Sequence, residues 1–205
     1  DLYTGSAAII AELIQNADDA AFAAGTTPEL LVSLLDGADG RPGLLVQSNE
    51  IGFSAADVRA ICDLGASTKR ADASTTGRKG LGFKSVFSIS DTPYILSRGY
   101  RWKFDVSDAR GLGLYGALVP LWADREELTR VLPPQAAHAA HEPTGTTFWL
   151  PLRTPDAPPP LSVAPSTLLF LRRLQVVRLH RAERLGGPLA MRRLASSSDA
   201  AAAAA

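Results

Sequence analysis

Residues 6–24 have the apolar and polar pattern of an amphipathic helix, which we expect to end near Gly25. At about 100° per residue, the apolar positions form one stripe suited to packing on a sheet: Ile9, Leu13, Ala17 and Ala20. The neighbouring acidic and amide positions span an arc of roughly 60°: Glu12, Asn16 and Asp19. This polar face is either an ordinary solvated surface or a set of oxygen atoms that orients a water molecule and holds a hard cation.

Short apolar runs between turn residues predict the strands of a sheet. They lie at residues 30–35, 44–47, 94–97, 100–106, 118–122, 146–152, 176–179 and 189–194. Two further helices are expected, one from the N-cap Ser54 through Asp63 and one over residues 168–174. This order of elements predicts an α+β fold with two layers. Residues 65–79 contain almost no large apolar side chains, so we expect that stretch to be mobile.

The composition is that of a soluble globular domain. The 205 residues suffice for one sizeable core, and the 21 basic and 21 acidic side chains balance, so neither nucleic acid nor a membrane is implied as a partner. Cys62 is the single cysteine, which excludes an internal disulfide and fits a reducing compartment. No apolar run has spanning length and no signal peptide is visible, so we expect an intracellular location, cytoplasmic or nuclear.

A glycine-rich turn precedes an apolar helical stretch at residues 77–87. Gly80 and Gly82 allow backbone N–H groups to approach an anion, and the following helix points its positive end to the same place. Three side chains add charge suited to phosphate: Arg78, Lys79 and Lys84. Phe83 interrupts the Gly-Lys-Ser order of a Walker A loop, and a third glycine of the dinucleotide fingerprint is missing. A tight structural turn is the alternative interpretation.

Four segments in this order resemble the GHKL superfamily of ATPases, which includes gyrase, the large heat-shock chaperones, histidine kinases and the mismatch-repair ATPases. They are ELIQNADDA at 12–20, SNEIGF at 48–53, GRKGLGFKSVF at 77–87 and GTTFWL at 145–150. These segments resemble the family's N-box, adenine-site glycine motif, phosphate-loop box and closing Gly-Thr strand. The stretches 49–69 and 77–93 are most similar to the sacsin and plant NO VEIN-like branch. The resemblance implies a two-layer α/β sandwich of the Bergerat type, with a mixed sheet and helices on one face.

The resemblance also implies a role for each matching residue. Glu12 matches the general base that activates the attacking water, Asn16 matches the Mg²⁺ ligand, and Asp19 matches the acid one turn further along. The positions that match the adenine site are Gly52, Phe53 and Thr146. The positions that match the start of the lid are Leu64, Gly65 and Lys69. The phosphate-facing positions are Gly80, Gly82 and Phe83, with Lys84 beside them. ATP and Mg²⁺ are the implied cofactors.

Ser48 departs from the family pattern, because most members have an aspartate there that accepts a hydrogen bond from the adenine amino group. A serine hydroxyl can accept one such bond, but it is neutral. Charge-assisted bonds are roughly twice as strong as neutral ones, so we expect weaker adenine selectivity. Asn49 or Glu50 could compensate, and the sequence does not decide between them.

Other conspicuous residues are interpreted as structural. His138, His141 and Glu142 have helical spacing in a Pro/Ala-rich segment, which favours a solvated loop over a metal site. All three tryptophans are expected in the core: Trp102, Trp122 and Trp149. The remaining interpretations are a small buried apolar residue for Cys62, a surface or packing residue for His180 and a solvated face for the arginines of 172–193.

We expect an ATP-binding domain at residues 1–152, truncated at its N-terminus because the chain enters the N-box helix almost at once and without a methionine. A proline-rich connector at 153–165 should lead to a helix–strand extension at 166–195 that packs on the same domain. Residues 196–205 form a low-complexity Ser/Ala tail.

The sequence thus predicts an ATP-binding module with slow Mg²⁺-dependent ATPase activity in a larger sacsin- or NO VEIN-like chaperone or scaffold protein. Its expected partners are the nucleotide, other domains of the full-length protein and a dimer partner. A sensor that binds nucleotide without turnover and a structural module that has lost binding are the alternatives. The presence of Glu12, Asn16, Gly80 and Gly82 argues against the structural module, and Ser48 keeps the sensor open.

Overall fold

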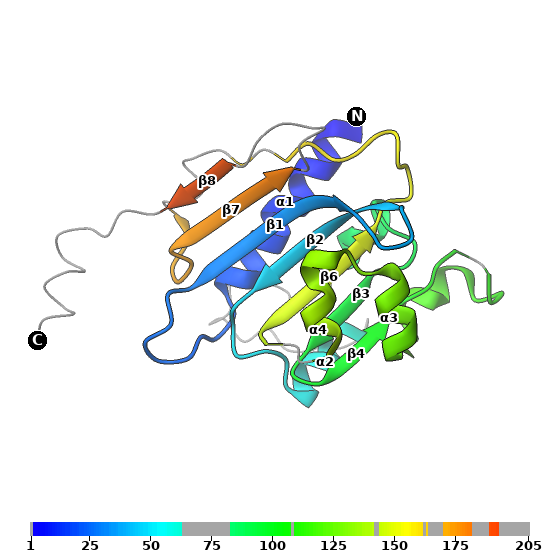
Figure 1. Ribbon diagram of the computed structural model, residues 1–205, viewed down its shortest axis with the longest axis horizontal. Helices are drawn as coiled ribbons and strands as arrows, with labels where there is room; N and C mark the ends of the chain where they lie inside the picture. The colour runs from blue at the N-terminus through cyan, green and yellow to red at the C-terminus, as the bar shows by residue number, and fades with distance from the viewer. Residues whose placement is uncertain are drawn as a thin grey trace, which may run out of the picture.

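The computed structural model describes residues 2–62, 83–107, 109–141, 144–161, 163, 170–181 and 189–192. A single sheet with strand order β5-β4-β3-β6-β2-β1-β7-β8 forms its centre (Figure 1). The strands are β1 (Glu29–Asp36), β2 (Pro42–Ser48), β3 (Tyr94–Ser97), β4 (Tyr100–Lys103), β5 (Leu121–Trp122), β6 (Thr146–Pro151), β7 (Val176–Arg181) and β8 (Leu189–Arg192). Among these strands β1 and β7 run parallel and the other neighbours antiparallel, so the predictions of an α+β fold and a mixed sheet are confirmed.

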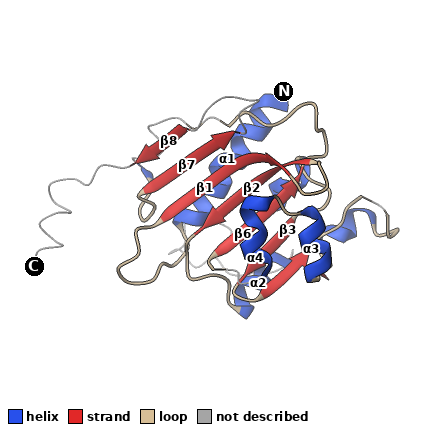
Figure 2. Cartoon of the chain, in the orientation of Figure 1, coloured by secondary structure: helices blue, strands red, loops and turns tan. Residues whose placement is uncertain are grey.

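Helices flank the sheet (Figure 2). The α-helices are α1 (Leu2–Asp18), α2 (Ala55–Cys62), α3 (Arg125–Val131) and α4 (Ala137–His141). The 3-10 helices are η2 (Phe83–Ser88), η3 (Gly113–Ala117) and η4 (Pro134–Ala136). Helix α2 begins as predicted, because Ser54 Oγ accepts the N–H of Asp57 and the Asp57 carboxylate accepts the N–H of Ser54, which forms a reciprocal capping box.

The larger core lies between the sheet and α1. Apolar residues of α1 are buried there, as the helical stripe predicts: Ile9, Ile10, Leu13 and Ile14. They pack against alternate positions of the central strands: Leu30, Val32, Leu44, Val46 and Ile95. Because side chains alternate across a strand, this set defines one face of the sheet.

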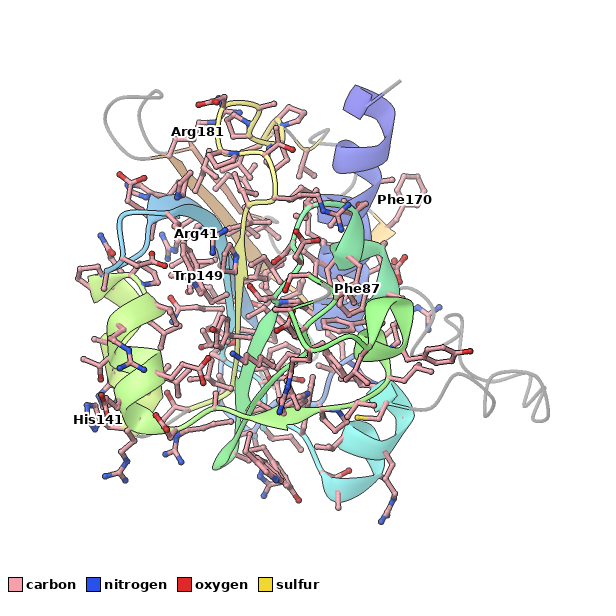
Figure 3. The ribbon with its side chains drawn as sticks, turned by 90° about the vertical axis from the view of Figure 1, so that its right-hand side faces the viewer. Arg41, Phe87, His141, Trp149, Phe170 and Arg181 are labelled. Atoms are coloured by element: carbon pink, nitrogen blue, oxygen red, sulfur yellow. The ribbon has the colours of Figure 1, made fainter. Side chains whose placement is uncertain are left out.

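A second core on the opposite face contradicts the prediction of helices on one face only. Figure 3 shows the sheet nearly edge-on, with α1 on one side and α3 and α4 on the other. The intervening strand positions point to α3 and α4: Leu35, Leu45, Leu96 and Trp149. They meet Leu128, Leu132, Ala136, Ala139 and Ala140. Strands that are apolar at consecutive positions bury both faces, and this pattern in β2 and β6 requires a second layer.

Two further predictions are wrong, one about the segment of His138 and His141 and one about Trp122. The segment around His138 and His141 is helix α4 and not a solvated loop, because Ala139 and Ala140 are buried against the sheet while both histidines stay exposed. Trp122 is 74% exposed, unlike the buried Trp102 and Trp149, because the two-residue strand β5 lies at the edge of the sheet and turns this ring outward.

The C-terminal end of α1 also differs from the prediction. The helix ends at Asp18, where the carboxylate, only 1% exposed, accepts the backbone N–H groups of Arg172, Arg173 and Leu174 at 2.8 Å each. Residues 171–174 are irregular and not helical as predicted, because their N–H groups turn toward this carboxylate. The Arg173 guanidinium donates to the carbonyls of Asp19 and Ala20, so the segment before β7 closes the end of α1.

Most predicted strands are confirmed with small shifts in their bounds. The hairpin of β3 and β4 turns at Arg98 and Gly99, both with positive φ, as a tight two-residue turn requires. Strand β4 ends at Lys103, three residues before the predicted limit. Of the strand predicted at residues 118–122, only the last two residues form a strand, β5. Strands β6, β7 and β8 occupy the expected places, and β7 extends the same sheet beside β1.

Candidate functional site

A pocket of about 270 Å³ lies on the α1 side of the sheet, at the C-terminal end of α1. Its floor consists of side chains from β1, β2 and β6. The strand register places Leu30, Ser48 and Thr146 in one row across the sheet, with Val46 and Phe148 paired in the next row. The floor is therefore apolar except for two hydroxyl groups.

The walls come from α1, α2 and the turns that follow α1 and β2. Small residues line the α1 side: Ala17, Ala20 and Ala21. Ala60 and Ile61 of α2 and Phe83 of η2 line the pocket as well. The backbone N–H of Ile51 donates to the carbonyl of Ala21, which joins the two turns at the rim.

The turn at Gly52 and Phe53 is fixed by close packing. Gly52 has φ +82°, and a Cβ there would lie 2.3 Å from Cγ of Arg98, so this turn requires glycine. The N–H of Phe53 donates to Oγ of Ser97, which in turn lies 2.7 Å from Oγ1 of Thr146. This buried hydrogen-bond chain ties the wall to the floor.

The sequence leaves open whether Asn49 or Glu50 compensates for the neutral Ser48, and the structure shows which of the two lines the pocket. The Asn49 amide donates to the carbonyl of Thr27 and accepts the N–H of Glu29, so it holds the loop before β1 and does not face the pocket. Glu50 does line the pocket. The hydroxyl Oγ of Ser48 is buried and has no hydrogen-bond partner among the described residues.

Four oxygen-bearing side chains are among the residues that line the pocket. Asn16 is on the last turn of α1 and Asp19 lies just beyond it, whereas Glu50 follows β2 and Asp57 is on α2. Glu12 lies one turn before Asn16 on the same helix face, about 6 Å along the axis, and does not line the pocket. Amide and carboxylate oxygens are suitable ligands for a hard cation such as Mg²⁺.

Lys84 does not line the pocket. Its Nζ donates to the carbonyl of Ala117 at 2.5 Å and lies 4.6 Å from the ring centre of Phe104. Burial lowers the pKa of the Lys84 ammonium, and burial raises the pKa of the half-buried Cys62 thiol. The carbonyl takes one of the three N–H donors of the ammonium, and the phosphate contact of Lys84 stays a prediction.

Several predicted positions lie outside the described residues. They are Leu64, Gly65, Lys69, Gly80 and Gly82, together with the whole stretch 65–79 that was expected to be mobile. Their roles stay predictions. Phe83 is described, and its side chain is buried, with its ring centre 5.6 Å from that of Phe148.

The structure thus brings together most of the described residues that the sequence singled out. They are Asn16, Asp19, Ser48, Gly52, Phe53, Phe83 and Thr146. Asp18 was missed, although the sequence contains a signal for it. It follows Ile10 and Ile14 at intervals of four residues, so a helix places this acid on the buried stripe.

No helix in the described part of the chain is both long and apolar enough to cross a membrane. No group of three or more His, Cys, Asp or Glu side chains within the described ranges could hold a metal ion, and Glu142 lies outside them.

Comparisons with known proteins point to one family. A family model described as the Sacsin domain matches residues 1–110. Protein NO VEIN of Arabidopsis thaliana is 37% identical over 186 residues, which cover 86% of this chain and 7% of that protein. Sacsin of Homo sapiens is 36% identical over 115 residues, which cover 50% of this chain and 2% of that protein. The chain therefore spans a small part of either relative.

Proposed function

Because the chain belongs to the Sacsin domain family, and because its pocket combines an apolar floor with the side chains of Asn16 and Asp19, we propose that it is a nucleotide-binding module that binds ATP with Mg²⁺. We also propose that its fold is of the Bergerat type found in GHKL ATPases. The α+β architecture with a mixed sheet and with α1 and α2 on the same face of that sheet supports that assignment.

One observation supports the proposal most strongly. Residues from segments far apart in the sequence line a single pocket: Asn16 and Asp19, Ser48, Gly52 and Phe53, and Thr146. These are positions that the resemblance assigns to nucleotide contact. A structural module that had lost binding would have no reason to keep a pocket between them.

The chemistry of the lining fits a nucleotide. A flat heterocycle suits the floor of Val46 and Phe148, and an unpartnered buried hydroxyl such as Ser48 Oγ is satisfied when a ligand atom pairs with it. Asp19, Glu50 and Asp57, which all line the pocket, would repel free phosphate groups, so the pocket suits a nucleotide whose charge a divalent cation offsets.

Asn16 and Asp19 are the residues that would hold Mg²⁺, which neutralises phosphate charge when bound. Asn16 contributes an amide oxygen and Asp19 a carboxylate from adjacent turns of the chain. Glu12, on the preceding turn of α1, is the group that would orient and deprotonate water. On this assignment binding and turnover depend on different residues of one helix face.

The position of Glu12 also favours a second candidate, a sensor that binds nucleotide without hydrolysis. Its carboxylate does not line the pocket, whereas Asn16 and Asp19 do. The chain covers only a small share of NO VEIN and sacsin, which supports a module within a longer chain. We propose that the other parts of that longer chain act as a chaperone or scaffold.

Replacing Asn16 tests the proposal. We expect calorimetric titration of the chain with Mg-ATP to show saturable binding at millimolar nucleotide or below. Asn16→Ala should weaken the affinity about 10-fold, since the loss of one hydrogen bond or ligand to a charged group costs about 1.5 kcal/mol. Gln15→Ala is the matched control, because Gln15 is on the same helix turn but does not line the pocket, and its affinity should equal that of the wild type.

Absence of heat with Mg-ATP and Mg-ADP would contradict nucleotide binding and favour the structural module. Equal losses of affinity in Asn16→Ala and Gln15→Ala would contradict the proposed position of the ligand.

A further inference from the structure

The side chain of Ser48 ends in a polar atom that the fold leaves unpaired. Ser48 is the last residue of β2 and is 8% exposed. Its Oγ is buried, and no hydrogen-bond partner for it exists within the described part of the chain. Leaving a buried hydroxyl unpaired is unfavourable, so proteins rarely retain one without a use.

The surroundings of Ser48 make it the polar contact for a flat ligand on this floor. Leu30 is its neighbour in β1, and Val46 lies two residues earlier on the same face of β2. Thr146, its neighbour in β6, is already paired with Ser97, and the Asn49 amide is occupied by Thr27 and Glu29. The backbones of β2 and the turn before β6 are in close contact here, since a Cβ on Gly145 would lie 2.0 Å from the carbonyl oxygen of Ser48.

A hydroxyl differs from a carboxylate in what it can recognise. A carboxylate only accepts hydrogen bonds, so it favours a base edge that donates from an amino group. A serine hydroxyl has one proton to donate and lone pairs to accept with, so it can pair with an amino group or with a carbonyl oxygen. Because the hydroxyl proton can rotate about the Cβ–Oγ bond, the same serine can accept from an amino group or donate to a carbonyl oxygen.

We propose that Ser48 is the specificity-determining residue of the pocket and that the pocket accepts purine nucleotides with either a 6-amino or a 6-oxo group. This inference rests on the proposed nucleotide-binding function and names the class of nucleotide. ATP and ITP are the clean pair for a test, because their bases differ at the 6-position and in the proton on N1. Because the Ser48 hydroxyl is neutral and can both donate and accept a hydrogen bond, we predict similar affinities for ATP and ITP.

The test is calorimetric titration of Mg-ATP and Mg-ITP into the full chain and two variants. For the wild type, the ratio of Kd for ITP to Kd for ATP should lie below about 5. Ser48→Ala should weaken both nucleotides by about 3- to 10-fold, the usual worth of one neutral hydrogen bond, and leave the ratio unchanged. Ser48→Asp should raise the ratio above about 20, because a carboxylate accepts from the amino group and repels the oxo group.

The outcomes separate this inference from the function on which it rests. Tight binding of ATP with a wild-type ratio above about 50 would overturn the inference and leave the proposed function standing. Ser48→Ala with unchanged affinity for both nucleotides would do the same. Binding of neither nucleotide by the wild type would overturn both. If Ser48→Asp does not fold, as judged by circular dichroism, the wild-type ratio and Ser48→Ala still decide the matter.

Discussion

Asp18→Ala is expected to lower the free energy of unfolding by about 3 kcal/mol, a large fraction of the stability of a single domain. The Asp18 carboxylate is almost fully buried and accepts three backbone N–H groups from residues 172–174. Alanine leaves these donors without an acceptor and releases the segment that joins β7 to the end of α1. Urea denaturation followed by circular dichroism measures the loss directly.

Asp18→Asn is the matched variant, because it keeps the shape and one acceptor oxygen. Its expected loss is smaller, about 1–2 kcal/mol. Asp39→Ala provides a surface control, since Asp39 is an exposed turn residue whose carboxylate accepts one local N–H. An Asp18→Ala protein as stable as Asp39→Ala would show that the buried carboxylate does not hold the C-terminal segment.

Glu12→Ala is expected to reduce ATP hydrolysis by about 10²- to 10⁴-fold, the usual contribution of a positioned general base. Its affinity for Mg-ATP should stay within about twofold of the wild type, because Glu12 does not line the pocket. Asn16→Ala should instead lower mainly the affinity for Mg-ATP and have the smaller effect on the rate of hydrolysis. Single-turnover hydrolysis and calorimetry on the same samples measure the two quantities.

Glu12→Gln keeps the size of the side chain but cannot accept a proton, so it should be as slow as Glu12→Ala. Glu126→Ala is a control on the far side of the sheet, where Glu126 forms an exposed ion pair with Arg130, and it should leave the rate unchanged. If Glu12→Ala and the wild type bind ATP equally and hydrolyse it at the same slow rate, the sensor replaces the ATPase.

The sequence predicts those parts of this fold that depend on local patterns. The stripe of Ile9 and Leu13 identifies α1, and the alternation in 146–152 identifies β6. Ser54 predicts the start of α2 because its capping box needs only residues three apart. Asn16, Ser48 and Thr146 were linked through segment order alone, and the sheet register brings them to one pocket.

The remaining features depend on contacts between distant residues. Nothing local to Ala139 and Ala140 shows that they pack on β2 and β6, so the second layer was missed. The helical spacing of Asp18 from Ile10 and Ile14 indicates burial, but its hydrogen-bond donors at residues 172–174 lie far away in the sequence. The carbonyl of Ala117 in η3, which accepts from the ammonium of Lys84, likewise comes from a segment 33 residues away.

The most direct test of nucleotide binding in this pocket is a titration of the isotope-labelled chain with Mg-ADP, followed through the backbone amide resonances. We predict saturable shifts at Asn16, Gly52 and Thr146, which line the pocket from three separate segments. Leu128 and Ala139, in the core on the other face of the sheet, should not shift. Unchanged resonances at all three pocket positions at millimolar Mg-ADP, or shifts confined to α3 and α4, would contradict the proposed site.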